Sequence, residues 1–180
     1  MTVYLIRHGQ SEFNAAHNEG EADPMIFDAP LTEKGRIQAE QARIAIRELG
    51  IQQVITSPLS RAIQTALTIF QGIAPISVQA GHRELLSHSC DMGRAPSALQ
   101  MDFSSLSFDH LDEIWWHQGP TNENGVPVEP RDIFQQRIRK FALELDQMAE
   151  IQLAVVGHGD VFKELAGFSM ENCEIREYPN

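Results

Sequence analysis

The strongest constraint on the fold is the alternation of short apolar runs with longer helical segments. Residues 2–6, 51–55, 76–79 and 152–156 are short and rich in Val, Ile or Leu, as expected for buried strands. Helical patterns occupy residues 32–49, the stretch up to residue 70, and residues 131–150 and 160–167. Strands separated by such helices form βαβ crossovers, so the sequence predicts an α/β three-layer sandwich with a mainly parallel central sheet and helices on both faces.

Single residues indicate where these helices begin and end. Thr32 is a plausible N-cap, Gly50 a C-terminal cap, and Pro58 suits the first turn of the next helix, where its missing N–H costs nothing. A last strand is expected within residues 173–178. The longest helix has an apolar stripe, and the first has apolar residues that include Ile37 and Ile44. The stripe consists of Ile133, Phe134, Ile138, Phe141, Leu145 and Met148.

Residues 85–130 lack this regularity and predict short helices and loops inserted after the third strand. At 180 residues, and with no linker or low-complexity run, the chain is expected to form one domain over residues 1–180. Trp115 and Trp116 lie in the insertion, where adjacent aromatic residues more often fix a segment to the core than bind substrate. We therefore expect them to be structural.

Charge and cysteine content restrict the partners and the location. A formal net charge of −11 argues against general binding to nucleic acid or anionic lipid. Cys90 and Cys173 are far apart and predict free thiols, and the histidines show no metal-ligand spacing, so no metal or other cofactor is expected. With no membrane-spanning run and no signal-peptide pattern, the expected location is the cytoplasm.

Polar clusters follow the predicted strands, at the point where each strand ends. Open parallel sheets place their sites outside the carboxyl ends of their strands, so these clusters are expected to meet. Two arginines, two histidines and a carboxylate gathered at one edge are suited to binding an anion. The clusters are Arg7-His8-Gly9, Ser57 to Arg61, His82 to Glu84, and Gly157-His158-Gly159.

Four of these pieces, in this order, make the chain resemble the histidine phosphatase superfamily, branch 1, which includes the cofactor-dependent phosphoglycerate mutases. The resemblance runs from the first strand to His158, nearly the whole chain. The matching segments are Arg7-His8-Gly9-Gln10-Ser11 with Asn14, residues 57–66 (Ser57-Pro58-Leu59-Ser60-Arg61-Ala62, then Gln64-Thr65-Ala66), Glu84-Leu85, and Gly157-His158-Gly159.

The resemblance implies a catalytic set. His8 would accept the phosphoryl group, and an imidazole is a competent nucleophile near neutral pH. Arg7, Arg61 and His158 would bind the phosphate, with hydrogen bonds from Ser11 and Asn14. Gly9 and Gly159 would let the backbone approach the phosphate closely. Glu84 would protonate the leaving oxygen and later activate the attacking water. Asp91, Asp102 and Glu113 lie in the same irregular region and are alternative acids.

The function expected from this set is metal-independent hydrolysis of a small phosphorylated metabolite through a phosphohistidine. The alternatives are a phosphoglycerate mutase-type transfer, a protein phosphohistidine phosphatase, and a phosphate-binding module without catalysis. Against the mutase, the segment after Glu84 lacks the Glu-Arg-x-Tyr-Gly stretch and basic insertion of that group, and only Arg83 and Arg94 supply cations nearby. Substrate choice is expected to lie in residues 85–130, and the substrate and oligomeric state cannot be derived.

Overall fold

The computed structural model describes residues 2–148 and 151–179 and has one five-stranded sheet with strand order β3-β2-β4-β1-β5. The first four strands of this order are parallel, and β5 is antiparallel to its neighbour β1. This confirms the predicted mainly parallel α/β sheet. The strands are β1 (Val3–Arg7), β2 (Gln53–Thr56), β3 (Ile76–Val78), β4 (Leu153–Gly157) and β5 (Ile175–Glu177).

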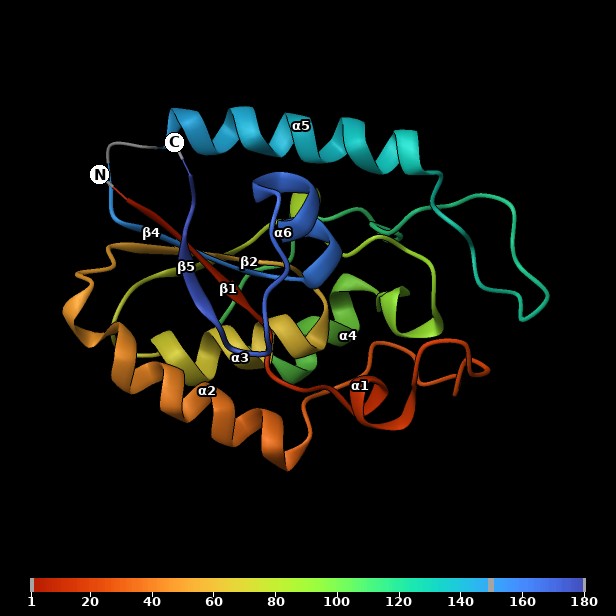
Figure 1. The fold of residues 1–180 in the computed structure, drawn as a ribbon, viewed down its shortest axis with the longest axis horizontal. Coiled ribbons are helices and arrows are strands. Elements are labelled where there is room, and N and C mark those ends of the chain that lie inside the picture. Colours follow the sequence, from red (N-terminus) through yellow and green to blue (C-terminus); the bar gives the residue numbers. More distant parts are fainter. Residues whose placement is uncertain (1, 149–150, 180) are drawn as a thin grey trace.

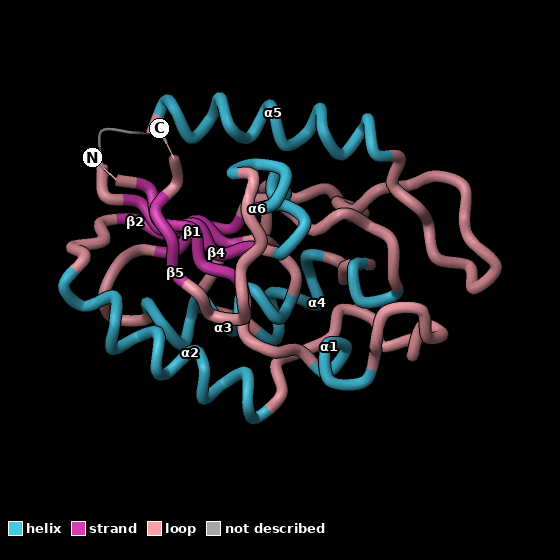
Figure 2. The backbone as a smooth tube through the Cα atoms, in the orientation of Figure 1, coloured by secondary structure: helices cyan, strands magenta, loops and turns pink. Residues whose placement is uncertain are grey.

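Helices cover both faces of the sheet, as Figures 1 and 2 show. On one face lie α2 (Glu33–Ala45) and α3 (Ser60–Phe70), and on the other α5 (Arg131–Gln147) and α6 (Gly159–Ala166). Side chains of a strand alternate between the two layers. Leu5 therefore packs with Phe141 of α5, while its neighbour Ile6 packs with Ala66 of α3.

Several helix boundaries differ from the prediction. Thr32 caps α2 as expected, but α3 begins at Ser60 with Leu59 as N-cap, so Pro58 precedes the helix instead of opening it. Helix α2 ends at Ala45, a short 3-10 helix η1 (Ile46–Glu48) follows, and Gly50 then has a left-handed φ of 61°. The helix predicted to reach Glu150 ends at Gln147, and Glu150 itself lies outside the described residues.

Not every apolar residue of the predicted stripes is buried. Ile37 is 50 % exposed, Ile44 68 % and Ile133 41 %, because each lies on the solvent side of its helix. Small residues of α2, Ala39 and Ala42, make the contact with the sheet layer instead. Periodicity was thus a better guide to the helix than to the face it buries.

The irregular region consists of short elements and loops, as predicted. It follows η2 (Ala80–His82) and contains η3 (Ser89–Asp91) and α4 (Pro96–Asp102). Elsewhere in the chain, a short helix α1 (Glu12–Ala16) follows β1. Trp115 is buried against Leu99, its Nε1 donates to the Arg94 carbonyl at 2.9 Å, and Trp116 contacts its edge, so the structural interpretation of this pair is confirmed. Among the described residues, no helix is both long and apolar enough to cross a bilayer.

Candidate active site

Six of the predicted residues line one small cavity at the carboxyl ends of β1 and β4, while His158, beside His8, and the two predicted glycines are not among its lining residues. Arg7 ends β1, His158 follows β4 as the N-cap of α6, and Arg61 lies in the first turn of α3. The cavity has a volume of about 140 Å³, and charged and polar side chains share its wall with Phe13, Leu85 and Cys90. Its lining consists of Arg7, His8, Ser11, Phe13, Asn14, Arg61, Glu84, Leu85, Ser87, His88, Cys90, Asp91 and Asp160.

His8 is buried and held in a defined tautomer. Its Nδ1 lies 2.7 Å from the Gly9 carbonyl, which can only accept, so Nδ1 carries the hydrogen and Nε2 carries the lone pair. The backbone of the residue is also fixed, because Asn172 donates to the His8 carbonyl and the His8 amide donates to Gly157. Burial, with help from Arg61 and Arg7, holds the pKa of His8 well below its usual value. The ring is therefore neutral at physiological pH, with Nε2 available to attack.

His158 lies beside His8, with ring centroids 5.2 Å apart. It is completely buried, and neither ring nitrogen has a hydrogen-bond partner within the described residues. Burial, followed by the charge of Arg61 and the neighbouring His8, holds the pKa of His158 well below its usual value. A neutral buried ring with both nitrogens free is costly unless a ligand completes it.

The two arginines differ in how they are held. Arg7 donates from one terminal nitrogen to the Met170 carbonyl at 2.6 Å, while its Nε is buried without a partner in the described chain. Arg61 is completely buried, and donates to the Cys90 carbonyl at 2.6 Å and to the Asp91 carboxylate at 2.8 Å. Each therefore keeps a fixed orientation and retains N–H groups for an anion in the cavity.

Glu84 lines the same cavity and has an unusual environment for a carboxylate. One oxygen accepts from the Leu85 amide at 2.9 Å and the other from the Asp160 amide at the start of α6 at 3.2 Å. Burial, with the nearby charges of Asp91 and Asp160, raises the pKa of Glu84 to about 7. A carboxyl group with this pKa can both donate and accept a proton near neutral pH.

The alternative acids are placed less favourably. Asp91 reaches the cavity, but its carboxylate forms the buried ion pair with Arg61 and accepts the His88 amide at 3.2 Å. Asp102 forms an ion pair with Arg94 outside this cavity, and Glu113 is exposed. Geometry therefore favours Glu84.

The smaller predicted contributors have local roles as well. Ser11 and Asn14 line the cavity and together form a capping box at the start of α1, each side chain accepting from the backbone of the other. Glycine was expected at position 9 so that the backbone could approach a phosphate. The structure gives another reason, because a Cβ there would lie 2.5 Å from the carbonyl oxygen of Gly35 in α2. A Cβ at Gly159 would meet the Arg7 guanidinium, with Nε at 3.5 Å.

Sequence reasoning missed the residues that support this set. Thr65 accepts from the Gly9 amide at 3.1 Å, and it does lie within the motif at residues 57–66. Met170 and Asn172 touch Arg7 and His8 from more than 160 positions away, and nothing in the sequence signals their approach. A search of the described residues finds no group of three His, Cys, Asp or Glu side chains placed to hold a metal ion.

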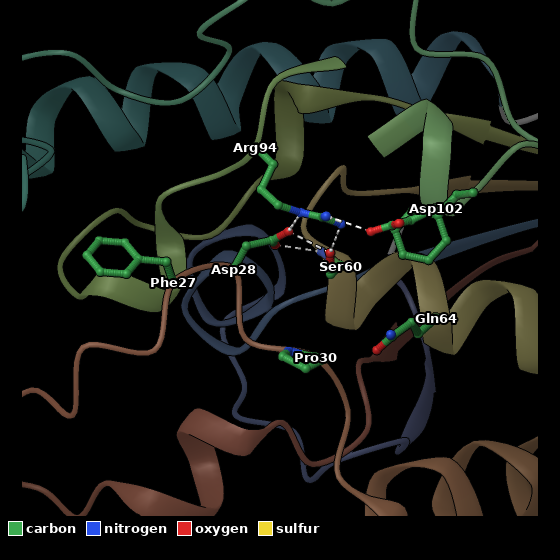
Figure 3. A pocket seen from close by; sticks show the side chains of 8 residues that line it. Phe27, Asp28, Pro30, Ser60, Gln64, Arg94 and Asp102 are labelled. Carbon is green, nitrogen blue, oxygen red and sulfur yellow. Dashed lines mark hydrogen bonds and ion pairs between the residues drawn. The ribbon is translucent and has the colours of Figure 1, made fainter. Parts of the chain in front are cut away.

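A larger cavity of about 480 Å³ lies on another side of the α3 N-terminus (Figure 3). It contains Asp102, one of the alternative acids, but its lining includes none of the residues expected to bind or accept the phosphoryl group. Arg94 spans it, donating to Asp28, Ser60 and Asp102. The other lining residues are Phe27, Pro30, Gln64 and Phe103.

The chain is similar in sequence and in fold to known proteins. The sequence profile of the histidine phosphatase superfamily (branch 1) matches residues 3–177. The adenosylcobalamin/alpha-ribazole phosphatase of Salmonella typhimurium is 29 % identical over 92 % of this chain and 77 % of its own length. "Probable phosphoglycerate mutase GpmB" of Cronobacter sakazakii is 35 % identical over 63 % of this chain, and the match spans only 44 % of that relative. The crystal structure of the alpha-ribazole phosphatase from Shigella flexneri superposes with a TM-score of 0.66 at 19 % identity, covering 98 % of this chain and 89 % of that one.

Proposed function

Because the chain belongs to the histidine phosphatase superfamily (branch 1), we propose that it is a phosphomonoesterase that needs no metal and works through a phosphohistidine on His8. The observation that carries the proposal is a His8 ring with its lone pair on Nε2, next to three buried nitrogens, Nε of Arg7 and both ring nitrogens of His158, that have no partner among the described residues. Buried donors around a nucleophile are expected where a phosphate binds.

In the first half-reaction, Nε2 of His8 attacks phosphorus and the bond from phosphorus to the leaving oxygen breaks. The electron pair of that bond stays on the leaving oxygen, which takes the proton of Glu84. The negative charge on the equatorial oxygens is stabilised by hydrogen bonds from Arg7, Arg61 and the neutral His158. The neutral state of His8 and the raised pKa of Glu84 both support this assignment.

In the second half-reaction, a water oxygen attacks phosphorus as the Glu84 carboxylate removes its proton. The bond from phosphorus to Nε2 breaks, its electron pair returns to the ring, and inorganic phosphate leaves. Glu84 is protonated again, so each cycle restores the starting state.

The substrate we propose is a small phosphorylated metabolite. A cavity of about 140 Å³ has room for a phosphoryl group and little more before it opens to solvent. Leu85, Ser87, His88 and Cys90 supply part of its wall, which supports residues 85–130 as the substrate-facing insertion. A mutase, a phosphohistidine phosphatase and a phosphate-binding module are the outcomes that the test must separate.

The test is rapid quench with a labelled phosphate ester in the presence of a chelator. We expect a stoichiometric burst of protein-bound label that is labile in acid, stable in base, and absent from His8→Ala. Label on Ser or Asp, or activity restored by one divalent ion, would contradict the proposal. Transfer of the label to a second substrate in preference to water would identify a mutase, and binding without a burst would identify a binding module. A burst with a phosphohistidine-bearing protein but not with the ester would identify a protein phosphohistidine phosphatase.

A further inference from the structure

The loop that bears Glu84 is held by a buried ion pair that the mechanism above does not use. Arg137 of α5 and Glu129, just before that helix, form a two-pronged contact, with Nε to Oε1 at 3.1 Å and a terminal nitrogen to Oε2 at 2.7 Å. The side chain of Glu129 is fully buried and that of Arg137 only 13 % exposed. Such a pair keeps the guanidinium in one orientation.

The remaining N–H groups of Arg137 all point to the Glu84 loop. They donate to the carbonyls of Gly81 at 3.0 Å, Arg83 at 2.8 Å and Glu84 itself at 3.4 Å. Glu129 adds a contact beyond the acid, because its amide donates to the Leu86 carbonyl at 2.8 Å. The Arg137–Glu129 pair thus holds the loop on both sides of Glu84.

The loop needs this support because little regular structure continues through it. Residues 80–82 form the short η2, and residues 83–85 belong to no helix or strand. The carbonyls of Gly81, Arg83 and Glu84 are partly buried and need hydrogen-bond donors. Arg137 donates to all three from α5, a helix that packs on the sheet. The position of the acid is therefore set by α5, about fifty residues further along the chain.

Arg137 does not reach the carboxylate of Glu84, which is held instead by the Leu85 and Asp160 amides. The charges that shift the pKa of Glu84 are those of Asp91, Asp160 and Arg61, acting after burial. Arg137 therefore affects the position of Glu84 and not its pKa. We propose that Arg137, oriented by Glu129, is a positioning residue for the general acid Glu84, an inference that rests on the proposed function.

The test compares Arg137→Met with a matched control, Arg139→Met, two residues away on the exposed side of α5. The burst is measured with 2-glycerophosphate, whose alkoxide needs a proton to leave, and with 4-nitrophenyl phosphate, which needs it far less. Displacing a catalytic group by about 1 Å costs about 10²-fold, so Arg137→Met should slow the glycerophosphate burst by about that factor. The nitrophenyl burst and the affinity for inorganic phosphate should stay within about threefold, and Arg139→Met should change neither.

Two further variants separate positioning from loss of folding. Arg137→Lys keeps the charge opposite Glu129 but cannot reach three carbonyls at once, so it should show the same selectivity with a smaller loss. In a Glu84→Gln background, Arg137→Met should cost almost nothing more, because the acid it positions is already absent. An equal fall on both esters, or an additive loss in the double variant, would overturn the proposal.

Failure of the proposed function itself would look different. If the wild-type protein forms no phosphohistidine, hydrogen exchange still reports on the loop, because the Leu85 amide donates to the Glu84 carboxylate. Faster exchange of this amide in Arg137→Met, with unchanged exchange in the strands, would show that the Arg137–Glu129 pair positions Glu84 whatever the reaction. Unchanged exchange at Leu85 would refute the positioning role on its own.

Discussion

The proposed catalytic cavity and the larger cavity of Figure 3 lie on different sides of the N-terminus of α3, and they differ in how fully the nitrogens at and beside them are satisfied. In the larger cavity Arg94 donates to Asp28, Ser60 and Asp102, so its nitrogens are used by the protein. In the smaller one, Nε of Arg7 and both ring nitrogens of His158 are buried without partners in the described residues. Of these two cavities, the larger is the one whose arginine is already satisfied by the protein.

The smaller cavity, unlike the larger one, thus has buried nitrogens at or beside it that a bound anion can satisfy, and unpaired buried nitrogens also occur in His17, His82, Arg83 and His117. A protein rarely leaves such groups unpaired, because each costs about 1–3 kcal/mol. The Arg94 network stabilises the protein without a ligand. Its Asp28 carboxylate accepts a hydrogen bond from the Ser60 amide at 2.8 Å and so caps α3, whose N-cap residue Leu59 has no side-chain acceptor. In the proposed catalytic cavity, we expect a bound anion to supply the missing partners.

The largest expected effect is that of Glu84→Gln, which keeps the shape of the side chain and removes its proton. General acid catalysis contributes about 10²–10⁴-fold, so the burst with 2-glycerophosphate should fall by that factor and the burst with 4-nitrophenyl phosphate much less. Asp102→Asn, in the other cavity, is the control and should change neither. An equal loss on both esters would make Glu84 a structural residue and direct attention to Asp91.

Arg61→Lys is expected to have the next largest effect. Lysine keeps the charge but loses the planar fork that can hold two oxygens, and loss of one aligned donor costs about 10²–10³-fold. Steady-state kinetics should show this factor in kcat/KM. The matched change Arg94→Lys, in the larger cavity, should leave turnover almost unchanged. If both substitutions impaired turnover equally, the distinction between the two cavities would be wrong.

The pH dependence should be smaller and have a defined sign. Glu84 must be protonated to act as the acid and has a pKa of about 7, so the glycerophosphate burst should fall about tenfold for each pH unit above that value. The pKa of His8 lies well below 6.5, so protonation of the nucleophile should not slow the burst until the pH is well below that value. The ratio of the glycerophosphate to the nitrophenyl burst cancels ionisation of the phosphate, and a ratio independent of pH would exclude Glu84 as the acid.

The smallest effect on activity is expected from Arg94→Lys. Lysine cannot reach Asp28, Ser60 and Asp102 together. Because the Arg94 side chain is partly exposed, thermal unfolding should show that the free energy of unfolding falls by only about 1 kcal/mol. The burst per folded molecule should stay within about twofold. A large change in the burst with no change in stability would mean that the second cavity takes part in the reaction.

Much of this arrangement could be predicted because the strands and the polar clusters at their ends are local signals. The clusters that contain His8, Arg61 and His158 were expected to meet because each follows a parallel strand. The carboxyl ends of such strands lie at the same edge of the sheet. The pairing of Arg61 with Asp91 could not be predicted, because it depends on how an irregular loop folds. Nor could Ile37 and Ile44 be placed, since helical spacing alone does not say which face meets the sheet.

The contacts of Met170 and Asn172 with Arg7 and His8 have a consequence for the time at which the site forms. On the ribosome, the segments that bear His8, Arg61, Glu84 and His158 are all made before these two residues. A nascent chain ending before residue 170 would therefore contain every side chain of the proposed chemistry, but Arg7 and the His8 backbone would lack partners that hold them. The contacts that fix Arg7 and the His8 carbonyl thus form only after residues 170–172 have been made, and they depend on closing a loop of more than 160 residues.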